Sequence, residues 1–308
     1  MTVKCVVCLV AALAACSAGR GKDNDGGVDN INDVPRNRCD VRAPFGIPVP
    51  VPGVNTNGDE GGAWLSADEL RIYYSLSPVP IDPLYHDLYL ARRATPAEPF
   101  AMPTKLESIS AARGEQPSLT ADELELFFVS EGGTDIWVST RPDVQSSFGS
   151  PMEETSVNAT MTTVDDDSPW ISADGATLYF ASTRDGNGHE LYRATRTSRD
   201  APFSAASILF SVNSFANEMR PVVRGDALEI LFASDRRQIM SSGGYTYDIY
   251  RSTRASLAEP FATPSLVAEL AEPTDEVPTW ISPDGCVLVF ASNRPGAGFY
   301  DLWMATRR

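Results

Sequence analysis

The sequence of 308 residues is poor in positive charge and in histidine: 25 lysines and arginines stand against 41 aspartates and glutamates, and two histidines occur. The formal net charge of -16 argues against nucleic acid as a partner and against adsorption to anionic lipid headgroups. A Gly-x-Ser-x-Gly motif is absent, which argues against a serine hydrolase. After residue 15, no apolar run is long enough to cross a bilayer. The composition is typical of an exported acidic globular protein.

A unit of three short strands is repeated along the chain. In residues 169–196 the strands are separated first by Asp174-Gly175, a dipeptide typical of tight hairpin turns. The unit recurs with a period of roughly 50 residues, and its turn aspartates are Asp68, Asp122, Asp174, Asp226 and Asp284. An acid opens each third strand (Asp87, Asp135, Glu190, Asp248, Asp301), and an arginine follows it by six residues (Arg93, Arg141, Arg196, Arg254, Arg307).

A fourth strand completes each unit. It begins at a phenylalanine seven residues after each of the first four arginines: Phe100, Phe148, Phe203 and Phe261. Four strands per repeat are typical of a β-propeller blade. The series opens with an isolated fourth strand at 45–54 and ends with a third strand at 299–307, so the first piece can complete the last unit and remove the open edges. We therefore predict an all-β fold: one five-bladed β-propeller over residues 44–308.

The motif also supports a family resemblance. Pro169-Trp-Ile-Ser-Ala-Asp-Gly175, with the aromatic strand and the acid-Leu/Ile-aromatic motif after it, resembles the TolB-like, WD-type β-propeller repeat of bacterial envelope proteins. The resemblance covers nearly all of the chain after residue 44, and it is specific for fold and weak for function. Ala63 and Arg224 depart from the pattern. The separate N-terminal domain of TolB is lacking, so a role in the Tol system does not follow.

The N-terminal segment has the features of an export signal. Residues 1–15 combine Lys4 with an apolar run, as secretory signal peptides do, and Leu13-Ala-Ala-Cys16 resembles the bacterial lipobox. That resemblance implies cleavage before Cys16 and acylation of Cys16, and Ser17 resembles the sorting signal for the outer membrane. We expect an outer-membrane lipoprotein that contacts the membrane through its lipid anchor only and faces either the periplasm or the cell exterior. The alternative is an ordinary signal peptide with an accidental cysteine.

Residues 16–43 are expected to form the lipidated cysteine and a flexible acidic tether. The stretch 17–38 is rich in Gly, Asn and Asp and cannot form a core. The run from Asp23 to Asp29 faintly resembles a calcium loop, but it lacks the later ligands and the closing glutamate of the EF-hand pattern. A solvated linker is the simpler interpretation.

The five cysteines divide by position. Cys5 and Cys8 would leave with the signal, and Cys16 would carry lipid, which leaves Cys39 and Cys286. The propeller topology places both at the same end of the last blade. We predict a disulfide that clamps the ring closure, with two free thiols as the alternative.

The loops between strands sort onto two faces of the predicted ring. One face carries the turns after strands one and three, where the spacing from arginine to phenylalanine is seven residues in every measurable case. The other carries the loops after strands two and four, and its spacing from turn aspartate to third-strand acid is 19, 13, 16, 22 and 17 residues. Variable loops on a rigid frame favour binding. We predict the variable face to be the binding face.

Acids just before the innermost strands are expected to ring the channel mouth on that face: Glu60, Glu115, Asp167, Glu218 and Glu276. Arg184, Arg236 and Arg294 follow second strands on the same face. The ring could attract a cation, a basic peptide or a sugar; alternatively, each acid caps a turn or pairs with an arginine between blades. The insert 235–247 adds Arg236, Arg237, Tyr245 and Tyr247, which suit recognition or simple loop packing.

Other candidate residues have structural interpretations. The run Asp165-Asp-Asp167 could bind a metal but lacks spaced partners, so a solvated loop is expected. His86 and His189 fill a position held by Tyr247 and Tyr300 in other units, which indicates packing. Trp64, Trp170 and Trp280 share one inner-strand position and are expected in the core.

Two functions remain open. The first is a lipid-anchored binding or scaffold protein, monomeric, without cofactor or metal, that holds an envelope protein, a peptide or a glycan. The alternative is an enzyme acting on polysaccharide, which would need two carboxylates about 5–10 Å apart with separated pKa values. Unpaired carboxylates in a solvent-filled mouth would favour the enzyme, and carboxylates engaged by arginines or backbone N–H groups would favour the scaffold.

Overall fold

A computed structural model describes residues 38–77, 86–109, 113–130, 135–237, 240–241, 244–296 and 299–308, with backbone alone at 240, 241 and 244. Cys16, the expected signal segment 1–15 and the tether up to residue 37 lie outside the described residues. None of the helices in the described ranges is long and apolar enough to cross a membrane.

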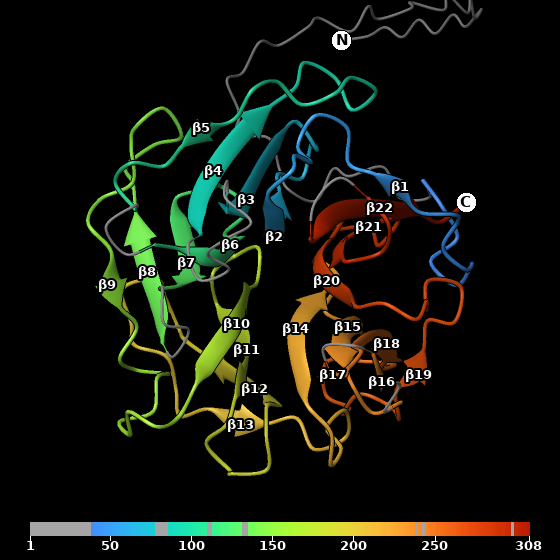
Figure 1. Ribbon diagram of the computed structural model, residues 1–308. Helices are drawn as coiled ribbons and strands as arrows, with labels where there is room; N and C mark the ends of the chain where they lie inside the picture. The colour runs from blue at the N-terminus through green and yellow to red at the C-terminus, as the bar shows by residue number, and fades with distance from the viewer. Residues whose placement is uncertain are drawn as a thin grey trace, which may run out of the picture. The chain divides into compact units, whose positions relative to one another are not determined.

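The described strands form five antiparallel sheets of four strands around a central axis, with β2, β6, β10, β14 and β20 innermost (Figure 1). Blade 1 contains β2 (Asp59–Leu65), β3 (Arg71–Ser77), β4 (Asp87–Arg92) and β5 (Thr104–Lys105). Blade 2 contains β6 (Glu115–Leu119), β7 (Glu125–Val129), β8 (Ile136–Thr140) and β9 (Met152–Glu153). Blade 3 contains β10 (Asp166–Ile171), β11 (Thr177–Ser182), β12 (Glu190–Thr195) and β13 (Ser207–Ile208). The predicted five-bladed propeller is confirmed.

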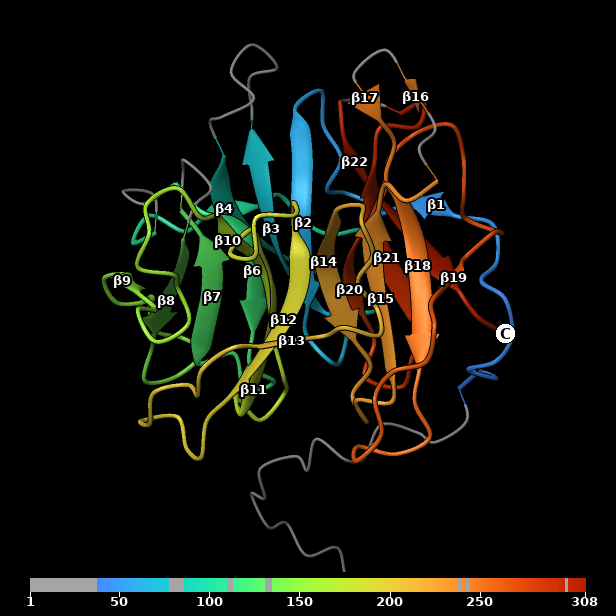
Figure 2. The same cartoon turned by 90° about the horizontal axis from the view of Figure 1, so that it is seen from below.

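Blades 4 and 5 complete the ring. Blade 4 contains β14 (Glu218–Val223), β15 (Glu229–Ser234), β18 (Asp248–Thr253) and β19 (Ser265–Leu266). Blade 5 contains β20 (Glu276–Ile281), β21 (Val287–Ser292), β22 (Asp301–Thr306) and, from the N-terminal side, β1 (Val49–Pro50). A further hairpin of β16 (Met240–Ser241) and β17 (Gly244–Tyr245) projects from one face, as the edge-on view shows (Figure 2).

The core lies between the blades. Each second strand is covered by neighbouring blades on both sides, so its side chains are nearly all buried instead of alternating between core and solvent. Phe180, Phe232 and Phe290 are fully buried on β11, β15 and β21. The three expected core tryptophans, Trp64, Trp170 and Trp280, are buried as well.

The turn aspartates recur because they organise their own hairpins. Asp174 accepts hydrogen bonds from the Ser172 hydroxyl at 2.6 Å and from the Ala176 amide at 2.9 Å. In blade 4 the Arg224 guanidinium replaces the serine and donates to Asp226 at 2.9 Å. The departure at Arg224 therefore preserves the turn with a different donor.

The fixed arginine–phenylalanine spacing reflects one recurring contact. Each arginine lies over a phenylalanine ring, with 4.2–4.7 Å between the guanidinium carbon and the ring centroid. The pairs are Arg93–Phe100, Arg141–Phe148, Arg196–Phe203, Arg254–Phe261 and Arg307–Phe45. The last pair joins the two ends of the propeller, because Phe45 fills the place of the phenylalanine that would follow Arg307 in the fifth repeat.

Ring closure uses less strand than the sequence suggested. β1 pairs with β22 in the register Val49↔Met304 and Pro50↔Trp303, and Phe45 forms an isolated bridge with Arg307. A continuous strand over 45–54 was expected, but Pro48, Pro50 and Pro52 have no N–H to donate to a ladder. The closing strand is therefore short, as the outer strands of the other blades are.

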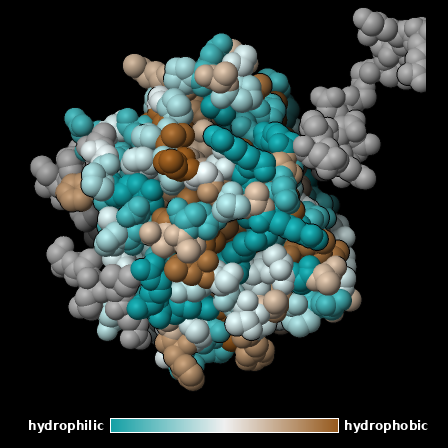
Figure 3. Space-filling model, turned by 90° about the vertical axis from the view of Figure 1, so that its right-hand side faces the viewer, coloured by the Kyte–Doolittle hydropathy of each residue, from teal (hydrophilic) through white to brown (hydrophobic). Residues whose placement is uncertain are grey.

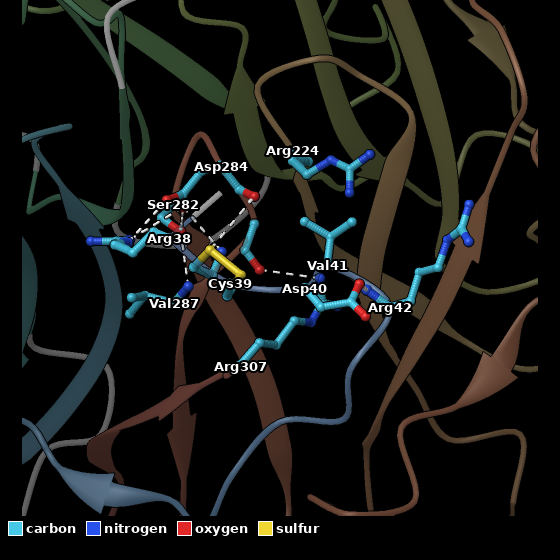
Figure 4. Close-up of a disulfide and its surroundings, with 12 residues drawn as sticks. Arg38, Cys39, Asp40, Val41, Arg42, Arg224, Ser282, Asp284, Val287 and Arg307 are labelled. Carbon is cyan, nitrogen blue, oxygen red and sulfur yellow. Dashed lines mark hydrogen bonds and ion pairs between the residues drawn. A yellow bond between two sulfur atoms is a disulfide. The ribbon is translucent and has the colours of Figure 1, made fainter. Parts of the chain in front are cut away.

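A disulfide joins Cys39 to Cys286, with 5.7 Å between their Cα atoms (Figure 4). Next to it, Arg38 forms ion pairs with Glu69 and Asp284, residues of the turns after the first strands of blades 1 and 5. We call the face that carries these turns the turn face, and the opposite face, with the loops after strands two and four, the loop face. The described chain therefore enters the propeller at the turn face.

Candidate functional site

The acids at the start of the innermost strands are not an exposed collar. Counted eight residues back from each turn aspartate, the equivalent positions are Glu60, Gly114, Asp166, Glu218 and Glu276. All four carboxylates at these positions are completely buried. The expectation had placed Glu115 and Asp167 in this set, but they lie one residue further along. Because side chains alternate along a strand, that shift turns them to the other side.

Three of the buried acids form ion pairs within their own blades, not between blades. Arg184 contacts Asp166 at 2.5 Å, Arg236 contacts Glu218 at 2.9 Å, and Arg294 contacts Glu276 at 3.1 Å. Each arginine also donates from Nε to a serine hydroxyl at the end of the second strand: Ser182, Ser234 and Ser292. These residues are part of the scaffold, and a ligand would have to break a buried pair to reach them.

Glu60 is the exception among the four. Its Oε1 accepts hydrogen bonds from the amide and hydroxyl of Thr56, and no ion pair to Glu60 exists among the described residues. Burial raises the pKa of Glu60 to about 7, against the hydrogen bonds from Thr56, and the nearby carboxylates of Asp301 and Asp59 add to the increase. Glu60 is therefore a buried carboxyl group that titrates near neutral pH.

The channel axis is almost filled. Each blade contributes two or three residues to the lining of a cavity of about 20 Å³, room for roughly one water molecule, and the first of them in each blade are Gly62, Gln116, Ser168, Arg220 and Pro278. A β-bulge interrupts every innermost strand here, and Gln116, Ser168 and Arg220 have φ of 54°, 56° and 53°. The bulges turn these residues toward the axis. This cavity is too small for a sugar ring or a peptide.

Arg220 gives the mouth its central positive charge. The atom Nη1 of Arg220 reaches toward blade 1, where a Cβ on Gly62 would lie 3.0 Å away. Burial lowers the pKa of Arg220, and the carboxylates of Glu115 and Asp167 act in the opposite direction. Glycine at position 62 thus leaves space for the guanidinium of another blade.

The two histidines join carboxylates at the mouth. His86 Nε2 lies 3.5 Å from Asp59 Oδ2, and its Nδ1 lies 3.1 Å from Glu115 Oε1 on blade 2. His189 Nε2 lies 3.0 Å from Asp167 Oδ2. The interpretation of these histidines as packing residues was therefore incomplete, since both also form charge pairs.

The equivalent tyrosines make a neutral version of the same link. The Tyr300 hydroxyl donates to Asp275 Oδ2 at 2.5 Å, and the Tyr247 amide donates to Asp275 Oδ1 at 2.8 Å. In addition, the carbonyls of His189, Tyr247 and Tyr300 accept the amides of Glu218, Glu276 and Glu60 on the following blades. This position therefore connects neighbouring blades around the mouth.

The pairing of His86 predicts a pH-dependent contribution to stability. Burial by itself would lower the pKa of His86, but Asp59 and Glu115 outweigh it and raise the pKa to about 9. Because the folded-state value lies above the ordinary 6.5, the stabilisation is fully present below pH 6.5 and is lost as pH rises through 9. We expect His86→Gln to reduce the free energy of unfolding by up to about 3 kcal/mol at pH 6 and by much less at pH 10.

Chemical denaturation of both proteins at these two pH values would check this expectation. His189→Gln is the matched control, with a smaller expected change because the His189 side chain is more exposed. An effect of His86→Gln that is equal at both pH values would contradict a charge pair, and packing would then be the sole source of the stabilisation.

The insert in blade 4 offers fewer free groups than expected. Arg236 is held by Glu218, and Arg237 contacts Asp248 at 2.7 Å. Tyr247 is half-buried, and Tyr245 is exposed. Of the four residues, Tyr245 alone presents a large part of its side chain to solvent without an ion pair.

The aspartate run 165–167 is not the solvated loop that was expected, because Asp166 is completely buried in β10. Asp166 points into the blade toward Arg184, and Asp167 pairs with His189. In the described ranges, no group of three His, Cys, Asp or Glu residues is arranged to hold a metal ion. The calcium-like stretch 23–29 lies outside these ranges.

Exposed apolar side chains on the loop face, apart from Tyr245, were missed by the sequence reasoning. Phe215 is fully exposed, and Met161, Tyr245 and Phe299 are each about half exposed or more. All four lie in the connections that follow second or fourth strands, and Tyr245 lies in β17 of such a connection. Alternation within strands cannot identify such residues, because they lie in connections. Elsewhere, on the side shown in Figure 3, apolar groups are scattered singly among polar ones, which is ordinary for a protein surface.

Comparisons with known proteins show similarity in fold. No family model matches the chain, and no curated protein sequence matches it. Among solved structures, TolB from Acinetobacter baumannii is 16% identical with a TM-score of 0.48; the match covers 82% of this chain and 55% of TolB, so the chain spans about half of that protein. The catalytic domain of the Coprinopsis cinerea GH62 α-L-arabinofuranosidase is 15% identical with a TM-score of 0.51, covering 86% and 96%. A thermostable family-43 glycoside hydrolase is 12% identical with a TM-score of 0.53, covering 82% and 89%.

Proposed function

We propose that this chain is a binding propeller of the bacterial cell envelope that holds a protein partner on its loop face. The observation that carries the proposal is the state of the carboxylates. Asp166, Glu218 and Glu276 are paired with arginines inside their blades. The mouth acids Asp59, Glu115 and Asp167 are paired with histidines. Such an arrangement serves to fix loops rather than to transfer protons.

The exposed apolar residues of the loop face support a macromolecular partner. Aromatic side chains are enriched among residues that contribute most to protein interfaces. Tyr245 and Phe299 belong to connections within blades 4 and 5, and Phe215 belongs to the connection between blades 3 and 4. The cavity on the channel axis has room for about one water molecule and is too small for an organic ligand. Protruding aromatic side chains fit a protein better than a small ligand.

Attachment to the outer membrane is part of the same proposal. The lipobox-like sequence ending at Cys16 supports lipidation, and a disulfide is typical of oxidising compartments outside the cytoplasm. Residue 38 lies at the turn face. A chain that is tethered through this end leaves the loop face accessible to partners.

A glycosidase is the second candidate. It is favoured by Asp59, Glu115 and Asp167, which come from three blades and act electrostatically on the same residue, Arg220. Two structural neighbours with TM-scores above 0.5 are glycoside hydrolases by name. Assays with aryl arabinofuranosides and xylan separate the candidates: turnover that disappears in Asp167→Asn would replace the binding function with an enzymatic one.

Site-specific photocrosslinking tests the binding function directly. A photoreactive amino acid replaces Phe215 on the loop face, and in a control it replaces Leu257, which is also exposed but lies on the turn face. We expect irradiation of intact cells to give one dominant adduct from position 215 and at least tenfold less from position 257. Mass spectrometry of the adduct names the partner. Equal labelling at both positions, or none at 215, would overturn the proposed face.

A further inference from the structure

Each third strand is directly followed by an arginine on the turn face, and four of these five arginines pair with a carboxylate. The pairs are Arg93–Glu69, Arg141–Glu123, Arg196–Glu125 and Arg307–Glu229, with contacts of 2.6–3.7 Å. The fifth arginine, Arg254, donates to the Ala227 carbonyl and lies over Phe261, but it forms no ion pair with any described residue. Blade 4 therefore has a third-strand arginine without a counter-ion.

The sequence explains why Arg254 has no carboxylate. The paired acids come from two positions: one directly follows the turn aspartate of the arginine's own blade, and the other lies three residues after the turn aspartate of the preceding blade. The acids are Glu69 and Glu123 at the first position and Glu125 and Glu229 at the second. For Arg254 the two positions hold Ala227 and Thr177. Both sources of a carboxylate are thus lost where blade 4 meets blade 3.

The joint between blades 4 and 5 shows what such a carboxylate binds. Glu229 there contacts Arg307 of the next blade at 2.6 Å and Arg251 of its own third strand at 2.5 Å. The register of the two ladders places Arg193 of blade 3 where blade 4 has Arg251, and Thr177 where blade 4 has Glu229. By the same geometry, two arginines flank the position of Thr177 without a carboxylate between them.

A tyrosine hydroxyl adds a further polar group. At the joint between blades 1 and 2, the Tyr73 hydroxyl accepts from Arg141 at 2.8 Å and donates to Glu123 at 2.7 Å. Tyr179 has the position of Tyr73 in blade 3, but its hydroxyl makes no hydrogen bond to the described residues. This hydroxyl is not among the polar atoms that are buried without a partner, so it reaches solvent.

The place of the missing carboxylate is in contact with solvent. Thr177, Arg193 and Arg254 lie in the described part of the chain, and each is partly exposed. Neither the Thr177 hydroxyl nor the Arg193 guanidinium has a hydrogen bond or an ion pair to that part of the chain. The turn aspartates of the two blades, Asp174 and Asp226, are held within their own hairpins. Two guanidinium charges therefore remain accessible here without a carboxylate in contact.

We infer that the joint between blades 3 and 4 is a binding site for a phosphate group. Arg193 and Arg254 supply the positive charge, and the hydroxyls of Thr177 and Tyr179 supply neutral donors. Guanidinium groups form charge-assisted, paired hydrogen bonds with phosphate. Two of them match the double negative charge of phosphate better than the single charge of a carboxylate. The site lies on the turn face, so it is independent of the partner surface proposed on the loop face.

Titration calorimetry of the full chain with inorganic phosphate tests the site. The titration is done at low ionic strength and pH 8, where phosphate carries about two negative charges. We expect millimolar binding by the wild type and at least about tenfold weaker binding by Arg193→Gln and by Arg254→Gln. Arg92→Gln is the matched control, because it removes an exposed arginine at the turn-face end of β4. This control should leave the affinity within about twofold.

Thr177→Glu covers the case in which the arginine variants fail to fold. It introduces at the equivalent position the glutamate that blade 4 has, so its carboxylate should pair with Arg193 and Arg254 and occupy the site. Phosphate binding should then be lost, while the melting temperature without phosphate stays the same or rises. Unchanged phosphate affinity in Thr177→Glu, or no phosphate binding by the wild type, would overturn the site.

Co-sedimentation with vesicles distinguishes the two sources of a phosphate group, a free ion and a lipid headgroup. The vesicles consist of phosphatidylcholine with or without phosphatidic acid, whose headgroup is a phosphate monoester. We expect the full chain to stay in the supernatant with both, because its net charge of -16 opposes approach to an anionic bilayer. Sedimentation that requires phosphatidic acid and is lost in Arg254→Gln would support the site and assign it to a lipid headgroup.

Discussion

Replacing Cys39 and Cys286 by serine should lower the free energy of unfolding by roughly 5 kcal/mol, the ceiling that the chain-entropy model gives for so long a loop. The two cysteines are 247 residues apart, so the bond restricts nearly the whole propeller in the unfolded chain. A loss of this size corresponds to a decrease in melting temperature of about 10–15 °C for a domain of this length.

The disulfide also acts where the ring is weakest. The closing strand β1 makes a two-residue ladder with β22, supplemented by the Phe45–Arg307 bridge. Without the covalent bond, separation of this segment from blade 5 costs little, and unfolding can begin there. Hydrogen exchange should therefore increase first in β22 of the serine variant.

Arg38→Ala is the matched control for the disulfide. Arg38 attaches the same segment to Glu69 and Asp284 through ion pairs, and its own side chain is 42% exposed. Exposed pairs contribute about 0–1 kcal/mol each, so this variant should melt within a few degrees of the wild type. A double serine variant that also melts within 2 °C of the wild type would show that the other closure contacts suffice.

The fold follows from the sequence because its determinants are local and repeated. Asp174 fixes its hairpin through residues two positions away on each side, and Arg196 meets Phe203 seven positions later. Five copies of such contacts set the strand order and the phase. The phase in turn places Phe45 against Arg307 across the closure.

The site was less predictable because it depends on single-residue register and on contacts between blades. Glu115 and Asp166 differ by one position relative to their turn aspartates, and that difference decides between a mouth residue and a buried one. The bulges that turn Gln116, Ser168 and Arg220 toward the axis have no signature in the residue pattern. The sequence supplied the list of charged groups, while their partners became visible only in three dimensions.

The second large effect is expected at Glu229 on the turn face. Glu229 is completely buried, and its carboxylate forms ion pairs with three arginines: Arg224 at 3.2 Å, Arg251 at 2.5 Å and Arg307 at 2.6 Å. Arg224 and Arg251 belong to blade 4, and Arg307 directly follows β22 of blade 5. One carboxylate therefore bridges three guanidinium groups across the joint between the last two blades.

Glu229→Gln should reduce the free energy of unfolding by about 3–5 kcal/mol, the usual cost of leaving a buried charge without its partner. The effect falls mainly on Arg307, whose side chain is 1% exposed and cannot turn to solvent. Glutamine keeps the volume of the site and some of the hydrogen bonds, so the loss reports on charge rather than on packing. Urea denaturation of the purified variant measures it.

Asp226→Asn is the control for Glu229→Gln, because Asp226 also pairs with Arg224 but its side chain is 48% exposed. Asparagine can still accept the Leu228 amide through its side-chain oxygen, and an exposed pair contributes about 0–1 kcal/mol. Similar losses in the two variants would mean that the buried cluster is no stronger than a surface pair. In that case the closure of the ring would depend on the disulfide and on the stacking of Arg307 over Phe45. A variant that combines Glu229→Gln with the two serine substitutions would then be no less stable than the variant with the serine substitutions alone.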